Sequence, residues 1–202
     1  ISLHDALPIS KEKREKIRRK ERRSIMRASR WSRLVYTALF TALTTVATLV
    51  IQVPSPMSGY VNLGDAMVLL SAWILGPVYG TAAAGIGSML ADLLSGYAYY
   101  APGTLIIKCL MAFVAAQVFL ALQDKTKGKR FAKVVSGLLA EIIMVVGYFG
   151  YAGLILGNGL SAALSIPGNL VQGGFGIIVS TVVYLALSQV IKMPKLLKGH
   201  EG

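Results

Sequence analysis

Polar side chains that could bind a small molecule interrupt the apolar stretches of this 202-residue chain at only a few positions. A charge at the centre of a bilayer costs roughly 2.5 to 3.5 kcal/mol, so such residues need partners, water or a ligand. Carboxylates, an ammonium group and amides that converge in an apolar site can orient a small heteroaromatic molecule. The predicted substrate-binding residues are Asn62, Asp65, Asp92, Tyr100, Lys108, Glu141, Tyr148, Asn169 and Gln172.

The sequence offers no constellation for catalysis or for a metal. The histidines, His4 and His200, lie near the two ends, and no Ser-His pair or phosphate-binding loop falls in an apolar stretch. The single cysteine, Cys109, has no histidine or second cysteine at ligand spacing, so we expect it to pack. We therefore predict no enzyme activity, no catalytic residues, no cofactor and no metal site.

Charge and hydrophobicity are segregated along the chain. It is 54% hydrophobic, yet it carries 21 Lys and Arg residues against 9 Asp and Glu. Twelve basic residues lie within Lys11–Arg33, five within Lys125–Lys133 and three within Lys192–Lys198, which leaves Lys108 as the single basic residue in an apolar region. The stretches between these clusters are too apolar to present a folded basic face, so we predict no nucleic-acid partner.

Four apolar segments have the length of a membrane span. Leu34–Val53 contains 20 residues without a charge, enough to cross about 30 Å of hydrocarbon as a helix. A proline- and glycine-rich segment follows it and should end the helix. The other three predicted spans are Gly103–Gln123, Val134–Leu156 and Ala162–Ile191.

The segment from Val61 to Gly96 is either one broken span or a hairpin of two. Gly76 and Pro77 would separate a helix over Ala66–Leu75 from one over Val78–Leu94. Two crossings place all three basic clusters on one side of the membrane, as the positive-inside rule requires. We therefore predict an all-α, integral membrane six-helix bundle, multi-pass in the cell membrane, with both termini cytoplasmic.

This topology places most of the polar candidates in the outer half of the membrane, where each also has a purely structural interpretation. Asp65 and Asn62 could cap the second helix. Asp92 and Lys108 could form an ion pair across adjacent antiparallel helices. Glu141 lies near the middle of the membrane, where neither a role as a helix cap nor a position at an interface would give its carboxyl group hydrogen bonds. Three tyrosines in one loop could equally form an interfacial belt or stack on a ligand; they are Tyr97, Tyr99 and Tyr100.

Small residues recur four apart, a spacing that lets helices approach closely in lipid. Ala38 and Ala42 form such a step on the first helix, where a partner protein is one possible neighbour. On the third helix the ridges could simply serve internal packing; they comprise Gly80, Ala84 and Ser88, and Ala83, Gly87 and Ala91.

Four segments resemble the substrate-binding S components of energy-coupling factor (ECF) transporters. They are Gly59–Ala66, Gly85–Gly96, Tyr100–Lys108 and Ile166–Gln172. The likeness extends over residues 34–191 and is close to the subgroup for riboflavin, pyridoxine and hydroxymethylpyrimidine uptake. It does not tell which vitamin is bound.

The resemblance implies a protein that captures a vitamin from outside and docks on one transmembrane coupling protein and two ATPases. It implies that Ala38 and Ala42 contact the coupling protein, and that the loop Pro54–Tyr60 acts as a lid. Residues 1–10 match nothing that follows and are taken as a non-native tail, and residues 192–202 as a cytoplasmic tail. Residues 11–33 form a basic arm longer than the family requires, which we expect to lie on anionic membrane lipid.

A secondary transporter is the main alternative, with Asp65, Asp92, Lys108 and Glu141 as an ion or proton path. Against it, the sequence shows no inverted repeat, and the cytoplasmic halves of the predicted helices lack polar residues that could pass an ion along. A membrane enzyme is a weaker alternative, for want of any catalytic constellation.

Overall fold

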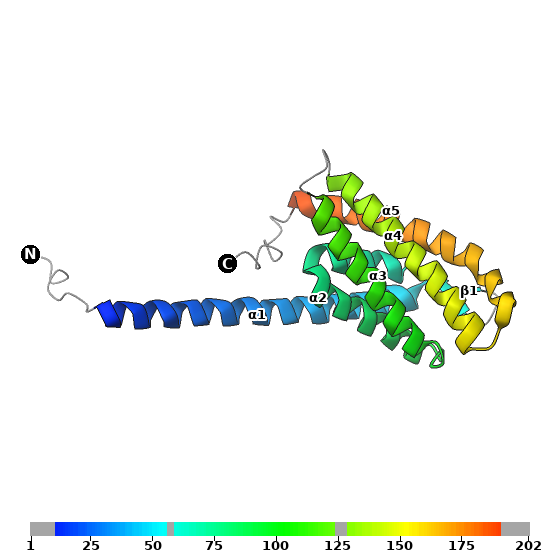
Figure 1. Ribbon diagram of the computed structural model, residues 1–202, viewed down its shortest axis with the longest axis horizontal. Helices are drawn as coiled ribbons and strands as arrows, with labels where there is room; N and C mark the ends of the chain where they lie inside the picture. Colours follow the sequence, from blue (N-terminus) through cyan, green and yellow to red (C-terminus); the bar gives the residue numbers. More distant parts are fainter. Residues whose placement is uncertain (1–10, 56–58, 124–128, 191–202) are drawn as a thin grey trace, which may run out of the picture.

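The computed structural model describes residues 11–55, 59–123 and 129–190, which form a bundle of long helices with one short hairpin (Figure 1). Within this part of the chain, five helices are long and apolar enough to cross a membrane. The prediction of a helical, multi-pass membrane protein is thereby confirmed at that level. The elements are α1 (Lys11–Val50), β1 (Gln52–Ser55), β2 (Gly59–Asn62), α2 (Gly64–Leu94), α3 (Ala101–Leu122), α4 (Lys129–Gly150), a π-helix (Tyr151–Ile155), a 3-10 helix (Gly159–Ser165) and α5 (Ile166–Val190).

Helix α1 continues without interruption across the predicted boundary between basic arm and first span, and its N-terminal part extends beyond the bundle (Figure 1). One face of the span carries threonines whose hydroxyls donate to the carbonyl four residues earlier, which satisfies them in an apolar environment. Thr45 also donates to the carbonyl of Gly87 on α2, at 2.9 Å. The inward face of α1 is therefore polar and tied to α2, while Leu39 and Leu43 on the other side are exposed.

Helix α2 is broken at Gly76, where φ is 78° and ψ is −174°. Glycine tolerates this left-handed φ, and Pro77 cannot supply a helical hydrogen bond. The chain then turns back on itself: the hydroxyl of Ser71 lies 3.1 Å from the carbonyl oxygen of Gly80. A Cβ on Gly80 would lie only 2.5 Å from the Ser71 carbonyl, so the close approach requires glycine. The break thus falls at the predicted residues.

Two short strands replace the loop expected after the first span. Antiparallel β1 and β2 pair Val53 with Val61 and Pro54 with Tyr60. The prediction that the first helix extends to Val53 is therefore wrong, because α1 ends at Val50 and Val53 lies in β1. A valine on each arm and Tyr60 on the second favour strands, and a two-stranded hairpin tolerates proline on an edge.

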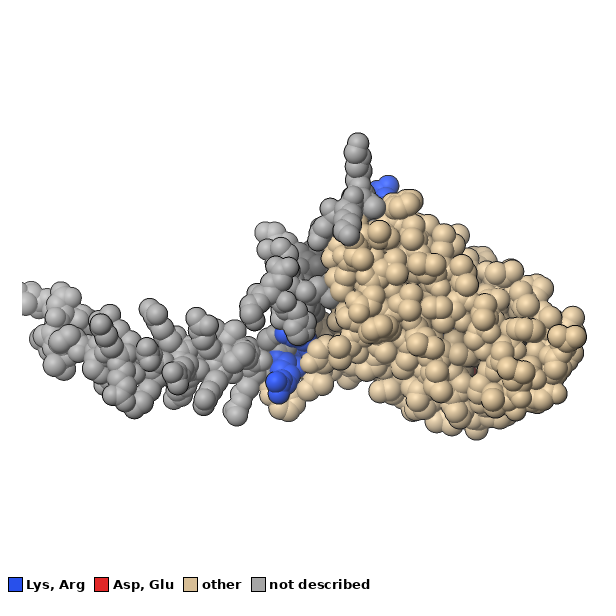
Figure 2. Space-filling model, viewed as in Figure 1, with Lys and Arg blue, Asp and Glu red and all other residues tan. Residues whose placement is uncertain are grey.

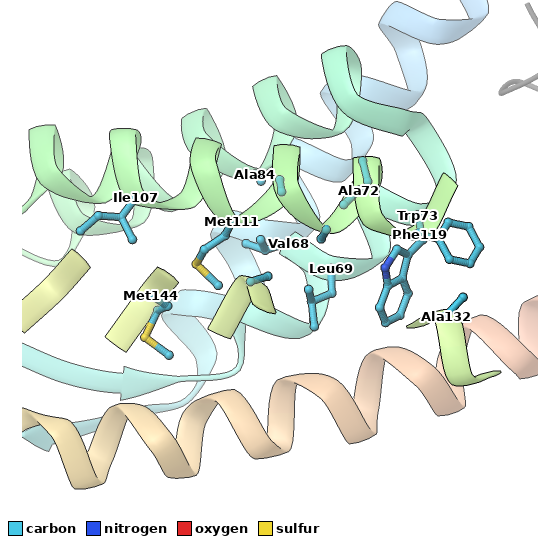
Figure 3. Close-up of a cluster of buried hydrophobic side chains, with 14 residues drawn as sticks. Val68, Leu69, Ala72, Trp73, Ala84, Ile107, Met111, Phe119, Ala132 and Met144 are labelled. Carbon is cyan, nitrogen blue, oxygen red and sulfur yellow. The ribbon is translucent and has the colours of Figure 1, made fainter. Parts of the chain in front are cut away.

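The main hydrophobic core lies where α2, α3 and α4 meet (Figure 3). Trp73 packs on Phe119 with ring centroids 6.2 Å apart, and its indole donates to the Ser136 hydroxyl at 3.0 Å. Val68, Leu69, Met111 and Met144 extend the core along the helices from these rings and are fully buried (Figure 3). This core fixes the rotations of three helices that also carry polar candidate residues.

The small-residue ridge predicted on the third helix packs internally. A Cβ on Gly85 would meet the Cys109 sulfur of α3 at 2.3 Å, and one on Gly87 would meet the Thr41 carbonyl of α1 at 2.6 Å. The ridge is thus the contact surface through which the second half of α2 approaches two neighbouring helices. Cys109 lies in this packing, as expected.

The described charged side chains lie at one end of the bundle or in its interior. In the part of the chain whose side chains are described, Asp65, Asp92 and Glu141 are all buried, and Arg30 and Arg130 are exposed. Figure 2 shows the basic side chains at one end, with the rest of this face uncharged. The hairpin lies at the opposite end, where α4 leads towards α5 (Figure 1).

Candidate functional site

A buried ion pair forms the centre of the site. Asp65, on the first turn of α2, is fully buried and accepts a charge-assisted hydrogen bond from the ammonium group of Lys108 on α3. The amide nitrogen of Gln172 on α5 donates to the other Asp65 oxygen at 2.6 Å. Buried charges need such partners to offset desolvation. The three residues therefore join α2, α3 and α5 at one point.

Gln172 also connects this centre to the hairpin. Its amide oxygen accepts a hydrogen bond from the backbone nitrogen of Asn62, at 2.8 Å. The side-chain oxygen of Asn62 accepts from the backbone nitrogen of Gly64, at 2.8 Å, at the start of α2. The capping interpretation therefore holds for Asn62, whereas for Asp65 it is wrong, because that carboxylate binds Lys108 and Gln172.

A second link joins the hairpin to the bundle. The phenol of Tyr60 on β2 donates to the carboxylate of Asp92 on α2, at 2.5 Å, and its ring centroid lies 4.8 Å from that of Tyr97. Burial and the adjacent carboxylate hold the pKa of Tyr60 above its ordinary value, so the phenol remains a proton donor. The proposed ion pair between Asp92 and Lys108 is wrong: Asp92 accepts from Tyr60, and Lys108 pairs with Asp65.

Aromatic residues line the space beside the ion pair. The Lys108 ammonium lies 5.5 Å from the ring centroid of Tyr148, whose phenol donates to the Thr104 hydroxyl at 3.0 Å. The ring of Tyr100 lies 6.3 Å from that of Tyr148 and 6.0 Å from that of Tyr151, centroid to centroid. Tyr100 is buried in this cluster, so it belongs to the interior of the bundle and not to an interfacial belt.

Glu141 is the exception to this pattern of paired groups. It is 6% exposed, and neither carboxylate oxygen has a hydrogen-bond partner among the described residues. Two glycines of α5 make room for it: a Cβ on Gly173 would lie 3.0 Å from one Glu141 oxygen, and one on Gly176 would lie 3.1 Å from the other. The Gly176 Cβ would also lie 3.0 Å from the Asp65 Cβ. The glycine face of α5 thus accommodates two carboxyl side chains.

A cavity of about 260 Å³ lies between α4 and α5. Glu141 and Asn169 are its polar lining residues, and the other walls are aliphatic or glycine. The remaining lining residues are Leu138, Ile142, Val145, Val146, Leu170, Gly173, Gly174 and Ile177. The cavity surface is almost entirely apolar, because both Glu141 oxygens are buried, and its walls include the exposed side chains of Ile142 and Leu170.

The predicted binding residues all take part in this region, but in different roles. Glu141 and Asn169 line the cavity, while the other seven connect the surrounding helices and the hairpin. Their contacts to a ligand stay a prediction. Sequence reasoning missed Thr104, Gly173 and Gly176, and it placed Tyr60 only in the lid. The spacing of Gly173 and Gly176, three residues apart on one helical face, was the available signal.

Comparison with known proteins identifies the family. The sequence model for the ECF-type riboflavin transporter S component matches residues 29–189. This chain belongs to that family. The resemblance inferred from the sequence is thereby confirmed.

Two relatives are similar to this S component over two thirds or more of its length. The thiamine precursor transporter HmpT of Lactococcus lactis subsp. cremoris is 30% identical over 169 residues, which cover 83% of this chain and 92% of the relative. An uncharacterized protein in the gap 3′ region of Pyrococcus woesei is 36% identical over 138 residues, covering 67% of this chain and 87% of the relative.

A solved structure shares the fold of this S component. It is that of the S component of a bacterial ECF transporter, with a TM-score of 0.62 and 21% sequence identity. The match covers 81% of this chain and 99% of the solved one. At this identity the likeness concerns the fold alone.

Proposed function

We propose that this S component captures a vitamin or vitamin precursor from outside the cell and delivers it to an ECF-type importer driven by partner ATPases. The observation that carries the proposal is the convergence of buried polar groups from four helices around Asp65, beside a mostly apolar cavity. The family assignment and the thiamine precursor transporter among the relatives support it. The S component itself is proposed to hydrolyse nothing.

In this proposal the hairpin β1–β2 acts as a lid over the site. Two hydrogen bonds hold it in place, from the Tyr60 phenol to Asp92 and from the Asn62 amide to Gln172. Gln172 also bonds Asp65 of the ion pair, and Asp92 lies on the second half of α2. A ligand that draws Asp92 or Gln172 away from these bonds would change how firmly the hairpin is held. Ligand binding would thereby be coupled to movement of the lid.

The chain is proposed to cross the membrane six times, with both ends in the cytoplasm. The break at Gly76 and the return of the chain at Gly80 support two crossings within α2. The three basic clusters then share the cytoplasmic side, and the hairpin lies outside. The basic segment 11–33 is proposed to rest on anionic lipid at the cytoplasmic face.

The surface of α1 is the proposed docking site for the transmembrane coupling protein. Ala38 and Ala42 are exposed, and their side chains are smaller than those of the neighbouring exposed residues Leu39 and Leu43. The inward face of the same helix is occupied by threonines bonded within α1 and to α2. A partner helix can thus approach this outer face without disturbing the bundle.

Uptake measurements in cells test this function against the main alternative. Accumulation of the labelled vitamin should require this chain and should stop when the partner ATPases are deleted. Uptake that persists without the ATPases and follows an ion gradient would instead support a secondary transporter. Mass spectrometry of small molecules that copurify with the chain would identify candidates for the labelled substrate.

A further inference from the structure

Glu141 and Asp65 bring two carboxyl groups together inside the bundle. A Cβ on Gly176 of α5 would lie 3.0 Å from the Asp65 Cβ and 3.1 Å from a Glu141 oxygen, so both side chains pack against the same glycine. Both residues are buried, and their carboxyl groups lie within hydrogen-bond reach of each other. Two carboxylates are both acceptors, so neither can bond the other unless one of them holds a proton.

The nearest cation balances only one of the two carboxylates. Lys108 binds Asp65, and Gln172 donates to the second Asp65 oxygen. Both Glu141 oxygens lack a donor among the described residues. If both carboxyl groups were ionised, Asp65, Glu141 and Lys108 together would carry one negative charge in excess.

The other titratable side chains around the pair do not supply the missing donor. They are Asp92 on the second half of α2, Tyr148 on α4 and Tyr60 on β2. Tyr60 donates to Asp92, and Tyr148 donates to the hydroxyl of Thr104. Neither α5 nor residues 34–50 of α1 include a charged residue. The charge on the pair therefore has no further neighbour that could offset it in the described part of the chain.

An excess negative charge is costly at this depth. The apolar segment that includes α4 extends over Arg130–Ile155, and Glu141 lies near its middle. Burial disfavours a lone carboxylate, and like charges in contact add repulsion, so adjacent buried carboxyl groups retain a proton. One proton makes the three residues electrically neutral and converts Glu141 into a donor. Asp65 can accept this third hydrogen bond, because a carboxylate has about four acceptor sites.

We propose that Asp65 and Glu141 bind one proton between them, and that this proton controls how firmly the site is closed for ligand capture. The O–H of Glu141 donates to Asp65, which holds α4 against α2 beneath the glycine face of α5. The inference rests on the proposed function and concerns the regulation of the same site. The proton belongs to the pair, because carboxyl groups in contact titrate together.

Loss of the proton acts on the hairpin through α5. Two carboxylates in contact repel each other, and Gly176 packs on both, so α5 has to move away from α2 and α4. Gln172 lies one turn before Gly176 and accepts the hydrogen bond from the backbone nitrogen of Asn62, so this movement weakens the link to the hairpin. Closure should therefore be complete at low pH, where the pair is protonated, and should be lost as the pH rises and the proton leaves.

Infrared spectroscopy of the purified full chain in lipid nanodiscs tests for the proton. A protonated carboxyl group has a carbonyl stretch that is separate from those of carboxylates and amides. The unmodified chain should show this band at neutral pH and lose it as the pH rises. Glu141→Gln should lack the Glu141 contribution at every pH, whereas Asp92→Asn should retain it.

Spin labels on the hairpin and on α5 test the effect on closure. Val53→Cys and Leu170→Cys, both at exposed positions, report the distance between β1 and α5 by double electron–electron resonance in a Cys109→Ala background. This distance should increase over the pH range in which the infrared band disappears. Glu141→Gln has no proton to lose, so its distance should stay short at every pH. Leu139→Ala, an exposed change on the same helix, should keep the pH response.

Two results would overturn the inference. The absence of a carboxylic acid band, or a band that Glu141→Gln leaves unchanged, would show that the pair does not hold the proton. A hairpin distance that stays constant while the band titrates in the unmodified chain would show that the proton does not control closure. ATPase-dependent uptake tests the proposed function separately, because vitamin capture without a pH response would leave that function intact.

Discussion

At the scale of residues, the site combines hydrogen-bonded pairs with carboxyl oxygens that lack a partner among the described residues, one on Asp92 and both on Glu141. Asp65 has its charge matched by Lys108 and its second oxygen bonded by Gln172, whereas Glu141 has no partner among the described residues. The paired residues hold the helices in register, and the carboxyl group of Glu141 is buried against the glycine face of α5. This division separates residues whose loss should reduce stability from residues whose loss should reduce binding.

Lys108→Met should destabilise the protein severely. It leaves the Asp65 carboxylate buried without its cation, a change that typically costs about 3 to 5 kcal/mol. Adding Asp65→Asn should recover most of the loss, since no charge then remains unpaired. Denaturant unfolding in detergent measures both variants, and an equal loss in the single and double variants would contradict the pairing.

Asn169→Ala should reduce ligand affinity alone, whereas Gln172→Ala should reduce both affinity and folding stability. Asn169 lines the cavity, so its loss should weaken ligand binding roughly tenfold, about 1.4 kcal/mol, with little change in unfolding free energy. Gln172 bonds both Asn62 and Asp65, so its loss should also lower stability by about 1 to 3 kcal/mol. Titration and thermal unfolding separate the two effects; unchanged affinity in both variants would move the ligand away from α5.

At the scale of elements, the glycine face of α5 sets how closely that helix approaches its neighbours. A Cβ on Gly176 would lie 3.0 Å from the Asp65 Cβ and 3.1 Å from a Glu141 oxygen, so α5 would have to shift outward. The helix α5 contributes Gln172 to the hairpin link and Asn169 to the cavity. A small outward shift should therefore disturb both at once.

Gly176→Ala should lower ligand affinity by tenfold or more and reduce thermal stability, since overpacking costs about 1 to 3 kcal/mol. Gly150→Ala is the matched control, because a Cβ at that helical position meets nothing within 4 Å. It should leave affinity unchanged and stabilise slightly, as glycine is a poor helix former. Similar losses in both variants would show that the effect is not due to contact with Asp65 and Glu141.

At the scale of the whole molecule, the interior of the bundle, its outer surface and its two ends differ in polarity. The polar residues and the hairpin gather at one end, the exposed described arginines lie towards the other, and aliphatic side chains cover the outer surface (Figure 2). This arrangement suits a protein that receives its ligand on one side and meets partners within the lipid.

The six-span topology predicts opposite labelling of two engineered cysteines. Residues Ser58 and Lys127 lie outside the described residues, in the segments that follow β1 and α3. A membrane-impermeant reagent added to intact cells should label a cysteine at position 58 and spare one at 127. Labelling of both from the same side would rule out two crossings within α2.

Replacing Ala38 and Ala42 with leucine should abolish transport and spare ligand binding. The added side chains enlarge the exposed face of α1, on the side away from the threonines that bond to α2. Uptake in cells and titration of the purified variant report the two properties. Leu34→Ala and Val35→Ala, at exposed positions nearer the N-terminal end of the apolar part of α1, provide controls in which uptake should persist. Undiminished transport in the alanine-to-leucine variant would exclude this face as the docking surface.

The sequence by itself determined the class of protein, the approximate spans and the polar positions. Hydropathy and span length are local properties, and so is the tendency of Gly76 and Pro77 to break a helix, which the φ of 78° at Gly76 bears out. The family followed from short motifs in the loops and helix ends. The strands β1 and β2 were missed because four-residue strands beside a proline carry a weak local signal.

Only the tertiary structure decided which polar residues pair. Lys108 is compatible in sequence with either Asp65 or Asp92, and the relative depth and rotation of the helices, fixed by packing around Trp73 and Phe119, select Asp65. The same packing leaves Glu141 without a partner and sets it against the glycine face of α5. Such assignments depend on contacts between residues far apart in the chain, which helical periodicity and hydropathy do not encode.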